Sequence, residues 1–545
     1  MFEKCYVIEW EILSINSNII VATYIFDWIS LMFLGFVLLI SSMVIFYRGD
    51  YMRGDRNVNR FIYLVLAFVF SMAMLIVRPN LIRILLGWDG LGLVSYALVI
   101  YYQNEKRANA GILTVLSNRI GDVAILLRIG LIFKLGGWNF IYYVYYLNDS
   151  HRLALKLLVM LAAMTKRAQI PFSAWLPAAI AAPTPVSALV HSSTLVTAGV
   201  YLMIRYSPSL LGSKISVLLL LISCLTIFMS GLGANFEYDL KKIIALSTLS
   251  QLGVILRILS LGMSVLAFFH LLTHALFKAL LFMCAGVVIH NVKEYQDIRA
   301  IGRLCRKIPL TRICINLANL ALCGTPFLAG FYSKDLILEM AFIGPINLVC
   351  FFLYVFATSL TVCYTFRLIY YRLTGLFNLR SFRAVNDSSS IITNPIVVLR
   401  LGAVFGGARL SWIIFPERYI ICIRSFMKIL TLLIRIAGAI TGYLLNIINI
   451  DYKLKSLRLY KYVVFIGSMW FIPFMSTINI SENRLKSGIN YYKICDKGWS
   501  ERLGGQGVFS SIISMSISIQ IFQDNGIKIF IKIFLILSVL LLFIL

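Results

Sequence analysis

Charge is scarce in this sequence of 545 residues. Asp, Glu, Lys and Arg make up only 13% of it and hydrophobic residues 60%, whereas a soluble globular protein is about a quarter charged. These proportions exclude a water-soluble enzyme. Acidic residues are the scarcest charges, because 23 Asp and Glu face 50 Lys and Arg, which leaves a formal net charge of +27. The basic residues are scattered through apolar runs, so we expect no nucleic-acid partner.

Metal-binding patterns are also missing. The ten cysteines form no CxxC pair and no Cys/His cluster with the spacing of metal ligands. A cysteine in an apolar run behaves as a small hydrophobic residue. We therefore expect this chain to bind no iron–sulfur cluster, haem or zinc.

Long apolar runs fill most of the chain. A helix that spans the bilayer needs about 20 apolar residues, and the runs predict an all-α polytopic membrane protein with about 15 transmembrane helices. The segment 481–525 is more polar, which predicts an amphipathic lateral helix along the membrane or a partner, before a final anchor span. The runs lie at about residues 26–47, 60–77, 81–102, 110–135, 153–180, 186–206, 213–234, 241–260, 263–290, 309–330, 346–373, 395–415, 427–448, 460–479 and 526–545.

Two of these runs are interrupted in similar ways. The first break follows Lys166 and contains Pro171, and the second is the stretch 323–326, which ends in Pro326. Proline removes a backbone donor, and lipid tolerates the freed groups only where they face protein or a water-filled cavity. Paired broken helices indicate a transporter built from inverted repeats. The alternative is two kinked helices without a function.

Ionisable residues inside the apolar runs are the candidate functional residues, because each costs at least about 2.5–3.5 kcal/mol in the bilayer centre. Asp89 lies in the middle of a predicted span, Lys166 lies beside the first break, and His191 lies on the following span. If Asp89 faces Lys166, the pair holds the lysine charged, and its separation releases a proton.

A second set of such residues follows a helical spacing. His270, His274 and Lys278 stand at i, i+4 and i+8 and share one helix face, and Lys334 lies beside the second break. Imidazole titrates near neutral pH and lysine releases its proton readily when desolvated, so the set favours a proton relay. A metal site and hydrogen-bonded core histidines are the alternatives. The polar stripe Ser247, Ser250 and Gln251, with Asp239, Lys241 and Lys242 at the start of its helix, is a weaker candidate for the same path.

Four motifs together resemble a known family. They are the stretches 85–92 (LLGWDGLG), 182–194 (from APTP to HSST), 270–278 (HLLTHALFK) and 330–335 (GFYSKD). They are similar to the chain 5 family of mitochondrial NADH:ubiquinone oxidoreductase, the respiratory complex I, in its insect form. The resemblance runs from about residue 7 to the end and is densest over 80–340.

The resemblance implies a fold, a function and partners. It implies two inverted five-helix repeats with broken helices, and a distal proton pump of the mitochondrial inner membrane driven by electron transfer from NADH to ubiquinone. The implied proton relay is Asp89, Lys166, His191, His270, His274, Lys278 and Lys334. NADH, FMN, iron–sulfur clusters and ubiquinone would be bound by other subunits. The implied partners are other membrane-arm subunits, above all the antiporter-like chain 4, and lipids such as cardiolipin.

The same resemblance divides the chain into six parts. We expect N-terminal spans at 1–80, a first antiporter-like repeat at 81–206 and a second at 207–373. The remaining parts are C-terminal spans at 374–480, the lateral helix at 481–525 and the anchor span at 526–545.

Three features depart from the family pattern. A complete span normally precedes the stretch 8–11, so the resemblance implies an N-terminus that is truncated or misassigned. Some members carry Glu before Pro-Thr-Pro, but this chain has Ala181-Ala182, so no proton role is assigned there. Arginine stands where the family commonly has serine. These arginines, together with Arg128, lie in or beside apolar runs: Arg78, Arg83, Arg128, Arg167, Arg257 and Arg312.

We infer that the printed sequence was translated with the wrong genetic code at these arginines. Invertebrate mitochondria read AGA as Ser and ATA as Met, whereas other codes read Arg and Ile. The chain is rich in Ile and has only 17 Met. We therefore predict that many of these positions are serine in the natural protein.

Two other functions compete with the proton pump of complex I. The large subunit of a cation/proton antiporter shares the same channel motifs, but a longer hydrophilic or fused C-terminal extension would favour it. A passive membrane scaffold needs no aligned titratable residues in lipid, so His270, His274 and Lys278 argue against it.

Overall fold

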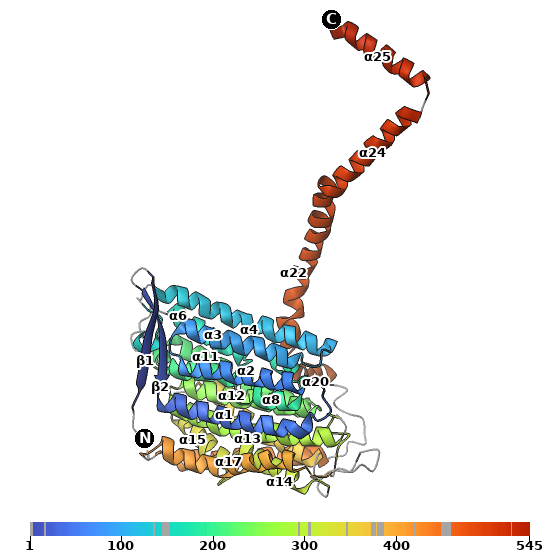
Figure 1. The fold of residues 1–545 in the computed structure, drawn as a ribbon. Coiled ribbons are helices and arrows are strands. Elements are labelled where there is room, and N and C mark those ends of the chain that lie inside the picture. The colour runs from blue at the N-terminus through green and yellow to red at the C-terminus, as the bar shows by residue number, and fades with distance from the viewer. Residues whose placement is uncertain are drawn as a thin grey trace. The chain divides into compact units, whose positions relative to one another are not determined.

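The computed structural model describes most of the chain (Figure 1). The described residues are 4–15, 18–133, 137–143, 153–190, 192–292, 295–302, 307–344, 347–371, 378, 386–387, 389–417, 421–447, 459–524 and 526–544. They form two units, Met1–Pro473 and Phe474–Leu545, which we describe separately.

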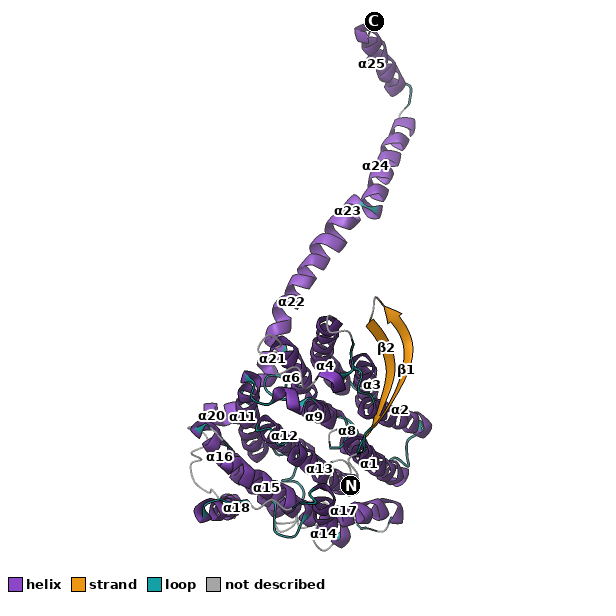
Figure 2. Cartoon of the chain, turned by 90° about the vertical axis from the view of Figure 1, so that its left-hand side faces the viewer, coloured by secondary structure: helices purple, strands orange, loops and turns teal. Residues whose placement is uncertain are grey.

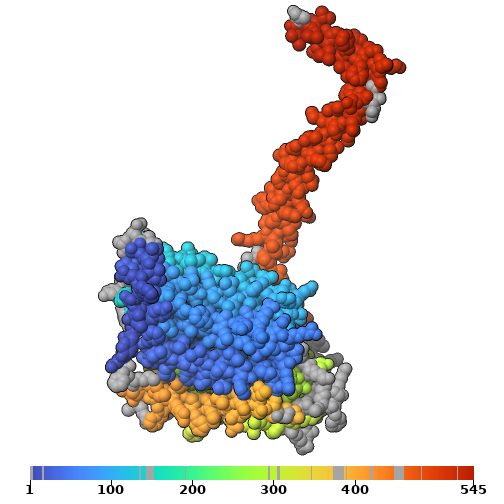
Figure 3. Space-filling view, in the orientation of Figure 1, coloured from blue at the N-terminus to red at the C-terminus, as the bar shows by residue number. Residues whose placement is uncertain are grey.

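The first unit is a bundle of helices that lie side by side, as the view along their axes shows (Figure 2). Its first helix starts at a capping box, in which the Ser30 N–H donates to the Asp27 carboxylate and the Asp27 N–H donates to the Ser30 hydroxyl. Residues of its first helices, coloured blue to cyan, cover one face of the unit in Figure 3. These helices are α1 (Trp28–Tyr51), α2 (Val58–Val77), α3 (Leu81–Val99), α4 (Glu105–Ile132) and the short α5 (Phe140–Tyr143).

The first predicted break divides one apolar run into short helices. Helix α6 ends at Lys166, Ala168 adopts a positive φ of 54°, and the chain resumes as a helix only at Trp175. Prolines keep the following pieces short, because proline cannot donate to the helical ladder. The pieces are α6 (Leu153–Lys166), α7 (Trp175–Ala179), α8 (Thr184–Val190), α9 (Leu195–Arg205) and α10 (Ser207–Leu210).

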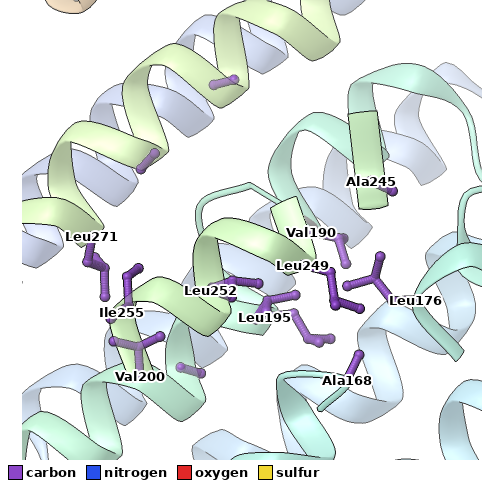
Figure 4. Packing of buried hydrophobic residues seen from close by; sticks show 14 of the residues in the cluster. Ala168, Leu176, Val190, Leu195, Val200, Ala245, Leu249, Leu252, Ile255 and Leu271 are labelled. Carbon is purple, nitrogen blue, oxygen red and sulfur yellow. The ribbon is translucent and has the colours of Figure 1, made fainter. Parts of the chain in front are cut away.

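Two helices form the centre of this unit. Helices α12 (Leu240–Ser260) and α13 (Ser264–Asn291) follow α11 (Lys214–Phe236), and nearly all their side chains are buried. A helix that is apolar on all sides is stable only when protein surrounds it. Figure 4 shows Leu249 and Leu252 of α12 among Leu176, Val190 and Leu195 of the broken segment, so the central helices pack directly on the first break.

The second predicted break separates α14 (Pro309–Cys323) from α15 (Ala329–Ile343). Pro309 starts α14, where its missing N–H costs nothing, and Gly324 ends it with a left-handed φ of 81°. The remaining helices of the unit are α16 (Leu348–Ile369), α17 (Ser390–Ile414), α18 (Ser425–Ile447), α20 (Tyr460–Gly467) and α21 (Ile472–Ser476), of which α21 crosses the unit boundary.

A β-hairpin precedes the first helix. The pattern of apolar runs did not predict this hairpin. Strands β1 (Tyr6–Ile15) and β2 (Asn18–Phe26) pair antiparallel, with Tyr6 opposite Phe26. The hairpin lies across one end of the helices (Figure 1). Strand β2 is rich in Ile, Val, Thr and Tyr, which fit a pleated surface.

The second unit consists of helices, and none of its side chains that the structure describes is buried. They are α22 (Ile478–Tyr491), the π-helix η6 (Tyr492–Ser500), α23 (Glu501–Leu503), α24 (Gly505–Asp524) and α25 (Lys528–Ile544). Its first helix begins at Ile478, close to the predicted start of the lateral segment.

Twelve helical stretches in the described residues are long and apolar enough to cross a membrane. This confirms a helical polytopic membrane protein but not the count of about 15. One of the twelve, Ile472–Gln523, overlaps the predicted lateral segment. At 52 residues it far exceeds the roughly 20 that a span needs, so its length favours a course along the membrane.

A close backbone contact fixes the second break. A Cβ added to Gly330 at the start of α15 would lie 1.7 Å from the carbonyl oxygen of Ala321 on α14. We expect Gly330→Ala to lower the free energy of unfolding by about 1–3 kcal/mol, because the two helices must separate. The measurement is the loss of thermal stability of the detergent-solubilised protein. Gly35→Ala on α1 is the matched control, because its Cβ would meet nothing within 4 Å.

Several of the unusual arginines lie deep in the core. Arg167 and Arg257 are fully buried, and none of their guanidinium nitrogens has a hydrogen-bond partner among the described residues. An unpaired buried charge is strongly destabilising. A serine hydroxyl in a helix can donate a hydrogen bond to a preceding backbone carbonyl oxygen, as Ser247 does to that of Ile244. The guanidinium carbon of Arg257 lies 3.2 Å from the Tyr354 ring centroid, so the missing partners favour serine most strongly at residue 167.

We therefore expect peptide mass spectrometry of the natural protein to find the mass of serine at residues 167 and 257, and no tryptic cleavage after residue 257. Arg205 is the internal control, since its guanidinium is paired with the Asp27 carboxylate, at 2.7 Å from Nη2 to Oδ1, and should be a true arginine. Tryptic cleavage after residue 257 would refute the serine assignment.

Candidate proton pathway

Lys166 is the centre of a first polar cluster. It is the last residue of α6 and is fully buried, and its Nζ donates to the carbonyl oxygen of Trp88 on α3 at 3.0 Å. The Trp88 ring centroid lies 4.9 Å from the same nitrogen. The break after Lys166 places the ammonium at the carboxyl end of a helix, where the helix dipole favours a positive charge.

The expected ion pair between Asp89 and Lys166 is not formed among the described residues. Asp89 follows Trp88 on α3, but its Oδ2 lies 4.0 Å from the guanidinium of Arg119 on α4. Its other oxygen, Oδ1, is buried and has no hydrogen-bond partner in the part of the chain that the structure describes. The orientation of α3 therefore gives Lys166 the carbonyl of residue 88 in place of the carboxylate of residue 89.

Asp122 on α4 is a second acid in this cluster, and the sequence analysis missed it. Its side chain is only 9% exposed, and its Oδ2 lies 3.6 Å from Arg119. It lines a small cavity together with Asp89, Asn118 and Arg119. Its position in the apolar run 110–135 could have identified it from the sequence, because a charge within the bilayer has a high free-energy cost and is usually functional.

The predicted face of α13 carries the second cluster. His270, His274 and Lys278 are all buried, and the two imidazole centroids lie 6.2 Å apart. His270 Nδ1 is hydrogen-bonded to the Ser333 hydroxyl at 3.0 Å, and Lys278 Nζ donates to the hydroxyl of Ser247 on α12. Ser247 therefore belongs to the same polar line, as the stripe on that helix suggested.

Lys334 lies on α15, one turn after the second break. Its Nζ donates to the carbonyl oxygen of Leu322 at 3.2 Å and to the hydroxyl of Thr361 on α16 at 3.0 Å. The carbonyl belongs to the last turn of α14, which the break leaves without a helical partner. The second break thus supplies a free carbonyl to Lys334, whereas the first places Lys166 at a helix end from which its Nζ reaches the Trp88 carbonyl of α3.

Several polar atoms in these clusters have no partner in the described part of the chain. They include both nitrogens of His274, Nε2 of His270 and both side-chain atoms of Asn118. Buried polar atoms of this kind require water, so the clusters have the chemistry of a hydrated proton path. His191, the remaining predicted relay residue, lies outside the described residues.

In the part of the chain that the structure describes, no three His, Cys, Asp or Glu side chains come together as ligands for a metal ion. The clusters contain groups that take up and release protons, and each lysine contacts neutral oxygens. This arrangement can hold a proton at an amine or an imidazole and pass it through water.

Three protein families match successive parts of the chain. The family described as "NADH-Ubiquinone oxidoreductase (complex I), chain 5 N-terminus" matches residues 10–62. The family "NADH:quinone oxidoreductase/Mrp antiporter, TM" matches 79–361, and "NADH dehydrogenase subunit 5 C-terminus" matches 364–545. Both predicted breaks and every predicted relay residue lie within the second match.

Relatives named NADH-ubiquinone oxidoreductase chain 5 match almost the whole chain. The protein of Anopheles gambiae is 59% identical over 97% of this chain and 92% of its own length. That of Locusta migratoria is 57% identical over 96% and 92%. That of Lumbricus terrestris is 44% identical over 92% and 87%.

Solved structures of lower identity share the fold. A chain of the Mrp complex from Dietzia has a TM-score of 0.75 and 24% identity, over 94% of this chain and 58% of that one. A chain of the archaeal membrane-bound sulfane sulfur reductase has a TM-score of 0.72 and 20% identity, over 95% of this chain and 91% of that one. The sequence relatives and the family matches together decide the assignment: the chain belongs to the NADH-ubiquinone oxidoreductase chain 5 family.

Proposed function

We propose that this chain 5 subunit translocates protons across the mitochondrial inner membrane through its two buried clusters. The chain is a multi-pass membrane subunit of a proton-translocating NADH:ubiquinone reductase. The energy comes from electron transfer from NADH to ubiquinone elsewhere in the complex. One observation carries the residue assignment: titratable side chains lie buried at both helix breaks and on the central helix between them.

The first cluster supports a charge-controlled release at Lys166. Asp122 and Asp89 lie on α4 and α3 beside the lysine, and Arg119 neutralises part of their charge. When the carboxylates approach Lys166, they stabilise its ammonium form. When they turn toward Arg119, the buried ammonium loses that support, and Nζ gives its proton to water in the path.

The second cluster supports transfer along α13. Residues four apart on a helix lie about 6 Å apart along its axis, which exceeds the length of a hydrogen bond but suits one bridging water. A proton can therefore pass between Lys278, His274 and His270 through single waters. Lys334 lies next to Ser333, the hydrogen-bond partner of His270, and is the terminal group.

The redox chemistry and the neighbours belong to other subunits. We place NADH, FMN, the iron–sulfur clusters and ubiquinone outside this chain. The adjacent subunit is the antiporter-like chain 4, and cardiolipin is a bound lipid. Long helices with exposed apolar side chains in the second unit, such as Ile512 and Phe522 of α24, support a role in covering neighbours and lipid.

Replacing Lys166 with methionine tests the first cluster. Methionine keeps the volume but has no proton to give, and a positioned proton-transfer group contributes about 10²–10⁴-fold to the transfer rate. We expect NADH-driven acidification of vesicles that contain the assembled Lys166→Met complex to fall at least tenfold, and oxidation of NADH by an artificial acceptor to stay normal.

Lys214→Met is the matched control, because Lys214 is an exposed lysine at the start of α11. It should pump protons at the natural rate. A normal ratio of protons to electrons in Lys166→Met would refute the role of Lys166.

Truncation after residue 480 tests the second unit. A helix that lies along neighbours gains its stability from them, so we expect the distal membrane arm to fail to assemble, as seen by native gel electrophoresis. Truncation after Gly526 removes only α25, so comparing the two truncations separates the role of α25 from that of the rest of the second unit. A full-size complex from the shorter chain would show that the segment does not brace the arm.

A further inference from the structure

Ser333 joins the two helices that carry the second cluster. It is fully buried on α15, immediately before Lys334, and its Oγ lies 3.0 Å from Nδ1 of His270 on α13. The hydroxyl of Thr273, one turn further along α13, lies 3.1 Å from the same Oγ, and its single proton reaches Ser333 or the carbonyl oxygens of Phe269 and His270. A third neighbour, the carbonyl oxygen of Gly330 on its own helix, lies 3.4 Å away.

The single hydroxyl proton of Ser333 has two competing acceptors. A serine hydroxyl donates once and accepts twice. If Ser333 donates to His270, Nδ1 carries no proton and the neutral ring holds its proton on Nε2. If Ser333 donates to Gly330, Nδ1 is the donor and Nε2 has a free lone pair. The orientation of the hydroxyl and the tautomer of His270 therefore change together.

The two tautomers differ in what they can transfer. Nε2 of His270 is buried and has no partner among the described residues, so it is the ring nitrogen left free to exchange a proton. With Nδ1 protonated, Nε2 takes a proton to form the imidazolium and later returns it, while Nδ1 keeps its bond to Ser333. With Nε2 already protonated, the same step is blocked.

We propose that Ser333 is a positioning residue that selects the His270 tautomer and thereby opens or closes proton transfer between α13 and Lys334. The proposal rests on the relay function proposed above. Ser333 and Lys334 are adjacent on α15, so a movement of α15 that releases Lys334 from Leu322 and Thr361 also changes the Ser333–His270 distance. The close contact of Gly330 with Ala321 keeps the competing carbonyl in place.

Ser333→Ala removes the hydroxyl, and Ser333→Thr keeps it. In vesicles that contain the assembled complex, we expect Ser333→Ala to lower the rate of NADH-driven acidification about fivefold, the effect of one lost hydrogen bond between neutral groups. Ser333→Thr should restore at least half of that rate. In a His270→Gln background, Ser333→Ala should cause no further loss, because both changes act on one ring.

The outcomes separate this proposal from the relay itself. Normal acidification by Ser333→Ala, with a loss in His270→Gln, overturns the role of Ser333 and leaves the relay standing. Normal acidification by both variants overturns the assignment of His270. A loss that Ser333→Thr does not restore, or that adds to the loss in His270→Gln, marks Ser333 as a structural residue and overturns the proposal.

Discussion

The free energy of keeping an ammonium group away from water governs the organisation of this fold. Lys166, Lys278 and Lys334 are buried, and each finds a neutral oxygen on a neighbouring helix. Lys166 and Lys334 lie beside the broken helices, and each also donates to a backbone carbonyl oxygen, that of Trp88 and that of Leu322. The second break, which weakens the helical ladder, therefore also supplies an oxygen that stabilises the buried charge of Lys334.

Much of this arrangement could be predicted from local sequence. Prolines located both breaks, and the four-residue spacing of His270, His274 and Lys278 placed them on one face, because both signals act within a single helix. Contacts between helices could not be predicted in the same way. The donation of Lys166 to Trp88, in place of an ion pair with Asp89, depends on the relative orientation of α3 and α6, which no local pattern encodes.

Other features escaped prediction for different physical reasons. Asp122 is a lone acid without a motif, and its importance appears only when α4 packs beside α3 and brings it near Asp89. The β-hairpin has apolar, β-branched strands that hydropathy alone does not distinguish from a membrane segment. The division into two repeats at 81–206 and 207–373, with flanking spans at 1–80 and 374–480, stays a prediction.

The contact between Gly330 and Ala321 bears on how the subunit prevents protons from leaking back through it. A subunit that moves protons must also prevent them from flowing back. A continuous chain of water molecules between two helices would let protons leak across the membrane. The space that would hold a Cβ at Gly330 is already filled by a backbone oxygen. No water fits between α14 and α15 at this point. The same missing side chain that permits the break therefore also leaves no room for water between the two backbones at Gly330.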